Sequence, residues 1–143
     1  MDRPATARTP AKTGAAIAIR ALPLLLLLTL FPVGWLTTLS PTFGTAMGWL
    51  FGTVEAHAIA HATIFFSLGL ALLAIVPALR RHAWRYVALM LVFGVAQEAL
   101  QLLYKQRPIE FDEFRDLGTD AAGFVVALLV QRSWALRARW RAS

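Results

Sequence analysis

The sequence predicts an all-α integral membrane protein with four transmembrane helices and both termini in the cytoplasm. Hydrophobic residues make up 58% of the 143-residue chain. Charged residues make up only 15%, against about 25% in a typical soluble domain. The charges are clustered, so the apolar runs between them are longer than the helices of a soluble protein. We therefore expect a multi-pass protein of the cell inner membrane.

The first predicted span covers residues 21–39, which at about 1.5 Å per residue reach roughly 29 Å, one hydrocarbon thickness. Residues 1–20 are rich in Ala, Thr, Pro and cations without an apolar period, and we expect a flexible basic cytoplasmic tail. Pro32 predicts a kink. A cleaved signal peptide is the alternative, but the apolar run is longer than usual and no clear cleavage site follows. We expect this span to be retained.

Residues 40–54 connect the first and second predicted spans and are rich in glycine. Gly44, Gly48 and Gly52 recur at intervals of four, a pattern that lets helix backbones approach closely. The same residues also fit an interfacial loop with aromatic anchors. Both interpretations remain open for this segment.

The remaining predicted spans cover residues 57–79, 86–104 and 117–136. A basic turn with Arg80 and Arg81 separates the second span from the third. The fourth meets Arg132 early, so we extend it on the assumption that this side chain reaches to the interface. The spans form one transmembrane domain, 21–136, and residues 137–143 form a basic cytoplasmic tail against an anionic leaflet.

The distribution of charge predicts the orientation. Eleven of the fourteen Lys and Arg residues lie in the N-terminal tail, in the turn after the second span and at the C-terminal end. Four spans place these segments on one side, which the positive-inside rule makes cytoplasmic. Although the pI is about 11.1, arginines that flank apolar runs argue against nucleic-acid binding. Cysteine is absent, which excludes disulfides and thiolate metal sites.

Ionisable side chains interrupt three of the predicted spans at similar depth. Counted from the charged residues that bound each span, Glu98 lies roughly 10 Å, His61 roughly 9 Å and Asp120 roughly 6 Å below the outer boundary. Gln101 follows Glu98 on one helix face, and His57 precedes His61 by one turn. Isolated charges facing lipid are costly. We therefore expect spans two to four to enclose a polar pocket that opens outward.

Four interpretations of this pocket remain open. His57 and His61, with Glu98 or Asp120 to complete the site, have the donor types of a site for zinc or a similar divalent metal. His61, Glu98 and Asp120 also suit acid/base chemistry without a metal. Recognition of an anionic or polyol headgroup by Arg107, Gln101 and His61, without chemistry, is the third interpretation. In the fourth, the polar groups only hold the helices together through hydrogen bonds.

Four segments, taken together, resemble the VanZ-like family of small bacterial membrane proteins. They are HAIAHATIFFSLG (57–69), EALQ (98–101), Arg107 and DLGTDAAG (116–123). The family pattern has Asp-Lys-x-x-His leading into a helix, Glu-x-x-Gln and then Arg in a later helix, and Asp-x-x-x-Asn-x-x-Gly opening the last helix. The resemblance covers about residues 55–130. This chain departs from the pattern at His57, Ala58 and Asp120, where Asp, Lys and Asn are usual.

The resemblance implies a role in the cell envelope, because the namesake of the family is associated with low-level resistance to the antibiotic teicoplanin. We expect the pocket to act on or bind an envelope lipid or a lipid-linked cell-wall component. The expected catalytic residues are His61, Glu98 and Asp120. The expected substrate-binding residues are Gln101, Arg107 and Asp116. Besides membrane lipids, the expected partners are proteins of a membrane complex, because the alternative is a small accessory subunit or assembly factor whose polar residues are structural.

Overall fold

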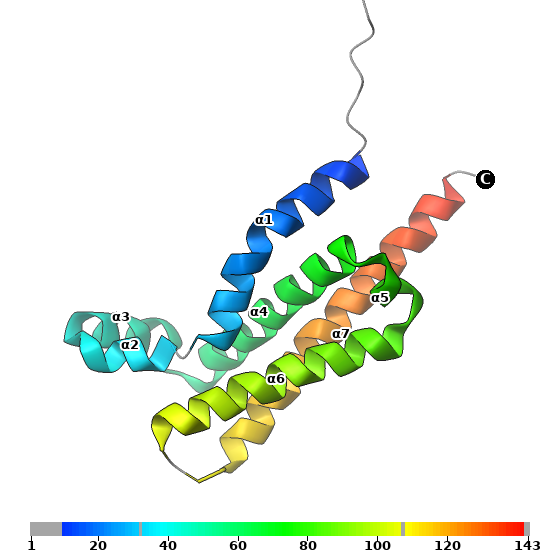
Figure 1. Ribbon diagram of the computed structural model, residues 1–143. Coiled ribbons are helices and arrows are strands. Elements are labelled where there is room, and N and C mark those ends of the chain that lie inside the picture. Colours follow the sequence, from blue (N-terminus) through cyan, green and yellow to red (C-terminus); the bar gives the residue numbers. More distant parts are fainter. Residues whose placement is uncertain (1–9, 32, 107, 142–143) are drawn as a thin grey trace, which may run out of the picture.

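The protein is a helical bundle in the computed structural model, which describes residues 10–31, 33–106 and 108–141. No strand occurs within these ranges, so the all-α prediction is confirmed for them. Four long helices run alternately in opposite directions, and the start of the first lies at the same end of the bundle as the end of the last (Figure 1). These are α1 (Pro10–Leu30), α4 (Val54–Ile75), α6 (Ala83–Lys105) and α7 (Phe111–Trp140). The short helices are α2 (Val33–Leu39), α3 (Pro41–Phe51) and α5 (Pro77–Arg81).

The first predicted span is the largest difference between expectation and structure. Residues 21–39 were predicted as one helix, but α1 ends at Leu30 and α2 begins at Val33. The break falls beside Pro32, whose ring disfavours helical geometry in the residue before it. The predicted kink at Pro32 lies outside the described residues. Helix α1 also begins at Pro10, so residues 10–20, predicted as a flexible tail, are helical.

Side-chain caps explain where α3 and α4 begin. The backbone N–H of Phe43 donates to Ser40 Oγ at 3.3 Å, and Pro41 occupies the first turn. The N–H of Ala56 donates to Thr53 Oγ1 at 3.1 Å in the same way. Residues 40–54, left open between a loop and a helix, therefore form α3 followed by the start of α4.

The end of α4 is set by Pro77, which follows two residues after the last helical position. Proline cannot continue a helix, and it leaves carbonyl groups without partners. Arg80 supplies those partners, because its Nε donates to Leu73 O and its Nη2 donates to Ala74 O at 2.7 Å. The predicted second span, 57–79, is thus divided between α4 and α5.

The third predicted span, 86–104, lies within α6, and the fourth, 117–136, lies within α7. Helix α7 begins earlier, after Glu110, whose backbone N–H donates to Glu113 Oε2 at 2.7 Å. A carboxylate in the first turn is favoured by the helix dipole. These helix ends leave a short connection between α6 and α7.

The apolar core lies in the half of the bundle near α5. Helix α4 packs most extensively against α7 and then against α1. The buried members of this core are Phe65, Leu68, Leu72, Leu73, Leu79, Tyr86, Met90 and Phe124. The hydroxyl of Tyr86 donates to Phe124 O at 2.8 Å, which satisfies the polar atom buried there. Packing in this half therefore fixes how the helices cross.

Two of the described helices, α4 and α6, are long and apolar enough to cross a membrane. Large apolar side chains also lie on the outer surface of the bundle. On α6, for example, Val92 is 65% exposed and Leu103 is 75% exposed. Helix α7 carries acidic residues in its first turns, which lowers its mean hydropathy.

Candidate functional site

Five ionisable side chains from α4, α6 and α7 meet in the half of the bundle away from the chain termini. We call them the polar cluster: His57, His61, Glu98, Asp116 and Asp120. Each comes from a position that the sequence pattern assigned to the inward face of its helix. The structure therefore brings together His61, Glu98 and Asp120, the expected catalytic residues.

His61 and Asp120 form the most deeply buried pair of the cluster. The distance from His61 Nδ1 to Asp120 Oδ1 is 2.9 Å, and Asp120 is 0% exposed. The carboxylate accepts this hydrogen bond, so the imidazole carries its proton on Nδ1 and leaves Nε2 for another partner. The imidazole is thereby held in one orientation.

A glycine allows this pair to form. At Gly123, an added Cβ would lie 2.3 Å from the carbonyl oxygen of Ala62. Helix α7 therefore approaches the backbone of α4 directly beside His61, one turn away from Asp120. A side chain at position 123 would separate the two helices and lengthen the hydrogen bond.

His57 and Asp116 form a second pair one helical turn nearer the end of the bundle. The distance from His57 Nε2 to Asp116 Oδ2 is 3.2 Å, and the His57 side chain is 38% exposed. The two imidazole rings lie 4.6 Å apart between centroids. Repeating the same His–Asp pairing one turn apart gives α4 and α7 a single register along this half of the bundle.

Asp116 lies just before the predicted fourth span. Burial raises the pKa of this carboxyl group, but the hydrogen bond from His57 and the charges of the two histidines and of Arg115 outweigh burial. The pKa of Asp116 therefore lies below its ordinary value. Arg115 Nη2 stands 3.5 Å from Asp116 Oδ1. The carboxylate is the charged partner of the His57 pair.

Glu98 is buried without a hydrogen-bond partner for either carboxylate oxygen among the described residues. It is only 7% exposed. One turn before it, an added Cβ at Gly94 would lie 2.8 Å from Leu117 Cδ1 and 3.6 Å from Asp120 Oδ2. Gly94 thus lets α6 approach α7 beside Asp120, which places Glu98 against the His61–Asp120 pair.

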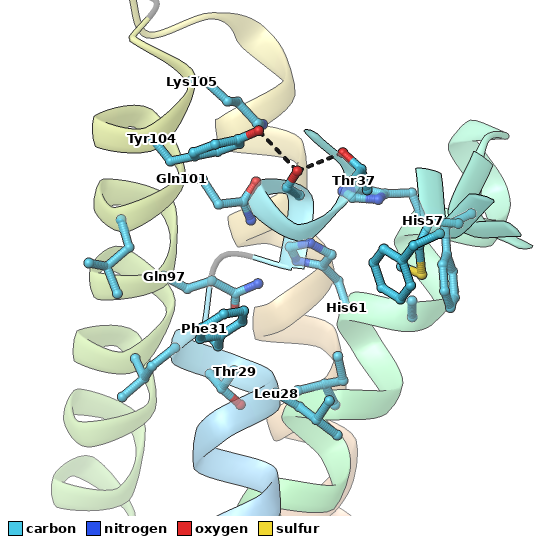
Figure 2. A pocket seen from close by; sticks show the side chains of 18 residues that line it. Leu28, Thr29, Phe31, Thr37, His57, His61, Gln97, Gln101, Tyr104 and Lys105 are labelled. Carbon is cyan, nitrogen blue, oxygen red and sulfur yellow. Dashed lines mark hydrogen bonds between the residues drawn. The ribbon is translucent and has the colours of Figure 1, made fainter. Parts of the chain in front are cut away.

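A cavity of about 500 Å³ adjoins the polar cluster (Figure 2). Polar side chains line one part of it, namely His57 and His61 from α4 and, facing them, Gln97, Gln101 and Lys105 from α6. We call this part the polar wall. The other wall is apolar and comes mainly from α1, α3 and α4. Its main side chains are Leu28, Phe31, Phe43, Met47, Phe51 and Ile64. The cavity therefore matches a ligand with one polar part and one apolar part.

Helix α2 is held over the end of α6 by hydrogen bonds at the edge of the cavity. Tyr104 Oη donates to Gly34 O at 2.9 Å, and Thr37 Oγ1 donates to the same carbonyl at 2.6 Å (Figure 2). The bond from Tyr104 joins α2 to α6, whereas the bond from Thr37 lies within α2. The short helices α2 and α3 therefore complete the cavity.

The cavity differs from the pocket that the sequence predicts. Spans two to four were expected to enclose it, but its lining comes from α1 to α4 and from α6. Glu98, Asp116 and Asp120 do not line it and lie behind its polar wall. His61 belongs to both the cavity and the polar cluster, because it lines the cavity and bonds to Asp120. The physical reason is the break after α1, which folds two short helices over the space that a continuous span would leave open.

The expected substrate-binding residues have separate outcomes. Gln101 lines the cavity, and Asp116 lies behind His57. Arg107 lies outside the described residues. Sequence reasoning assigned no role to Thr29 and Tyr104, which also line the cavity. The available signal was Ser40–Pro41, because a capping serine before proline marks the start of a new helix after residue 39.

Two groups within the polar cluster have the donor atoms and proximity to hold a metal ion. One group is His57, His61 and Asp116, and the other is His61, Glu98 and Asp120. In each group the ligand atoms lie within 4.8 Å of one another. The expected set of His57, His61 and Glu98 is not one of them. Asp116 and Asp120 on α7 each pair with one of the two histidines, and Glu98 on α6 lies nearest the pair of His61 and Asp120.

Comparison with known proteins assigns no family to this geometry. A scan against models of protein families finds no match, and searches of curated proteins and of solved structures find none either. The resemblance to the VanZ-like family therefore stays a prediction that depends on the four segments quoted above.

Proposed function

We propose that the protein crosses the cell inner membrane four times and binds an envelope lipid, or a lipid-linked cell-wall component, in the cavity beside His57 and His61. The observation that carries this proposal is the cavity itself, which joins a polar wall to an apolar wall. Its volume of about 500 Å³ falls within the roughly 300–1,000 Å³ of ligand sites. Such a volume suits a headgroup and the first part of an attached chain.

The membrane location is supported by the exposed surface and by the arrangement of the helices. Apolar side chains on the outside of α1, α6 and α7 suit contact with lipid. The start of α1, the basic helix α5 and the end of α7 lie at one end of the bundle (Figure 1). If α1, α4, α6 and α7 each cross, the segments rich in Lys and Arg face the cytoplasm together. The cavity then opens near the outer face.

The polar wall suits an anionic headgroup. Lys105 and His57 supply positive or proton-donating groups at the end of the cavity, and Gln101 supplies an amide between them. Arg107 was predicted to bind the same negative charge. Phe31, Phe43 and Met47 on the other wall suit the apolar part of the ligand.

The polar cluster gives this site the parts of an acid/base catalyst. His61 faces the cavity, and Asp120 holds its imidazole in one tautomer, as in the histidine–carboxylate pairs that activate hydroxyl groups. On this proposal, His61 is the general base for a hydroxyl group of the ligand or for water. Asp120 is a positioning residue.

The proposal is tested by filling the cavity. Ile64→Trp on α4 places an indole ring in the cavity, whereas Ile59→Trp, on the exposed side of the same helix, is the matched control. Native mass spectrometry of the detergent-purified protein should detect a bound lipid in the wild type and in Ile59→Trp. The adduct should be lost in Ile64→Trp. Equal adducts in both variants, or none in the wild type, would contradict the proposal.

A second candidate function, an accessory subunit of a membrane complex, is favoured by the outer face of α3. Trp49 is 86% exposed, and an added Cβ at Gly48 would meet no atom within 4 Å. Helices α2 and α3 project from the side of the bundle (Figure 1). A subunit that docks through this face should migrate with partners after extraction in mild detergent, and Gly48→Leu should release it. Monomeric migration of the wild type excludes this candidate.

A further inference from the structure

Two buried acids, Glu98 on α6 and Asp120 on α7, have carboxylate oxygens that the hydrogen bonds of the bundle do not satisfy. Both carboxylate oxygens of Glu98 and one of Asp120, Oδ2, are buried and have no hydrogen-bond partner within the described part of the chain. Both side chains are more than nine-tenths buried. Buried acceptors of this kind are rare, because they lose their hydrogen bonds to water without replacement. Something has to satisfy three oxygens in one place.

The third member of the group is an imidazole. His61 Nδ1 lies 2.9 Å from Asp120 Oδ1, close to the separation of two ligand atoms on one ion, so Nδ1 is the ring nitrogen that can ligate a metal beside Asp120. A histidine ligates a metal in its neutral form, so Nδ1 gives up its proton when the ion binds and Nε2 carries the remaining one. One imidazole and two carboxylates are ligands for zinc and for other divalent ions of the first transition series. The imidazole disfavours magnesium and calcium, which prefer oxygen.

Distances and charge agree with a cation. Ligand atoms around tetrahedral zinc lie about 3.4 Å from one another, and those of His61, Glu98 and Asp120 lie within 4.8 Å. Side-chain rotations that move the ligand atoms by about 1 Å would therefore bring them to the separations found around zinc. Two carboxylates and a neutral imidazole carry two negative charges, which a divalent cation balances. Without a cation, two buried carboxylates face each other across a medium that screens them poorly.

We propose that His61, Glu98 and Asp120 bind one divalent transition-metal ion, with zinc as the reference ion. The ion joins α4, α6 and α7 where each contributes one ligand, and it lies behind the polar wall of the cavity. This inference does not depend on the proposed lipid ligand, because the metal can join the helices whether or not the cavity is filled. It replaces the role of His61 as general base, because an imidazole that ligates the ion has no ring nitrogen free to accept a proton.

The first experiment uses the full-length protein, purified in detergent after removal of any polyhistidine tag. After metals are removed with a chelator, zinc alone is titrated and followed by calorimetry, and thermal unfolding is measured with and without the ion. We expect one zinc per chain and a rise in Tm. The absence of saturable binding to folded wild-type protein would overturn the proposal and favour a proton shared between Glu98 and Asp120.

The second experiment assigns the ligands. Glu98→Gln and Asp120→Asn keep the size of each side chain, and Glu55→Gln makes the same change at an exposed position at the start of α4. The first two variants should weaken zinc binding by at least about 100-fold, since even indirect contacts to a metal are worth about 10–100-fold. Glu55→Gln should bind as the wild type does. Unchanged binding in folded Glu98→Gln, or loss only in His57→Gln, would overturn the assignment to this group.

Discussion

The same three helices are joined in two different ways along the length of the bundle. In the half of the bundle near α5, the apolar core holds helices α4, α6 and α7 together. The buried hydroxyl of this core, Tyr86 Oη, donates to a carbonyl. Near the connection between α6 and α7, they meet through the polar cluster, where Glu98 and Asp120 keep unpaired oxygens. The buried hydroxyl of the apolar half has a hydrogen-bond partner within the protein, whereas three buried oxygens of Glu98 and Asp120 in the polar half have none among the described residues. Local conflicts of this kind are typical of functional sites.

This comparison predicts that substitutions in the two halves separate stability from binding. Changes in the apolar core should lower the free energy of unfolding and leave ligand binding intact in the protein that remains folded. Changes of the unpaired groups in the polar cluster should do the opposite. The changes that follow are ordered from the largest expected effect on stability to the smallest.

The largest effect is expected at Gly123, where the two halves meet. In Gly123→Ala, the new Cβ would lie 2.3 Å from Ala62 O, which is backbone and cannot rotate away. The free energy of unfolding should fall by about 3 kcal/mol. Gly118→Ala on the same helix is the control, because an added Cβ meets nothing there. Reversible unfolding in detergent measures both, and an equal effect of the two changes would contradict the close contact of α4 with α7.

A smaller loss is expected from the apolar core itself. Leu68 is fully buried, and Leu68→Ala leaves a cavity between packed helices, which should cost about 2 kcal/mol. Zinc binding by the folded variant should stay within about twofold of the wild type, because Leu68 lies outside the polar cluster. Calorimetry on the same sample checks this. A large loss of affinity would show that the two halves are coupled.

Tyr86→Phe tests the hydrogen bond of the buried hydroxyl in the apolar core. The change removes the hydroxyl that donates to Phe124 O at 2.8 Å, and it should cost about 1 kcal/mol. Tyr104→Phe is a useful comparison, since that hydroxyl bonds to Gly34 O at the exposed edge of the cavity. Thermal unfolding of both variants should rank Tyr86→Phe as the more damaging. The reverse order would place the more important contact at the cavity edge.

The smallest effect on stability is expected at Glu98. In metal-free protein, Glu98→Gln removes a buried carboxylate that has no hydrogen-bond partner, so the free energy of unfolding should change by less than about 0.5 kcal/mol or increase. The same variant should lose zinc binding. Denaturation in the presence of a chelator measures the first quantity. A loss of several kcal/mol would show that Glu98 holds the helices together.

Much of the polar cluster was predictable from helical periodicity. His61, Glu98 and Asp120 were placed at similar depth by counting residues along each span, and the structure brings them together. Which histidine meets which carboxylate was not predictable, because that register depends on the close contacts at Gly94 and Gly123. Spacing along one helix carries no information about its rotation against the next.

The cavity was predicted less well than the cluster. The apolar run of residues 21–39 reads as one span by length and composition, and nothing in its periodicity shows that the chain folds back after Leu30. The covering helices were detectable only through short local signals, namely the proline after Phe31 and the cap at Ser40. The hydrogen bond from Tyr104 to Gly34 joins positions far apart in the chain. Such contacts do not follow from local patterns.

The most direct test of the account asks whether the polar half serves a ligand or only the fold. Glu98→Gln, the control Glu55→Gln and the wild type are expressed to equal membrane abundance in cells that lack their own copy, and the lipid and antibiotic-susceptibility profiles are compared. The account predicts that Glu98→Gln behaves like the deletion, whereas Glu55→Gln behaves like the wild type. A deletion phenotype that folded Glu98→Gln fully restores would contradict it.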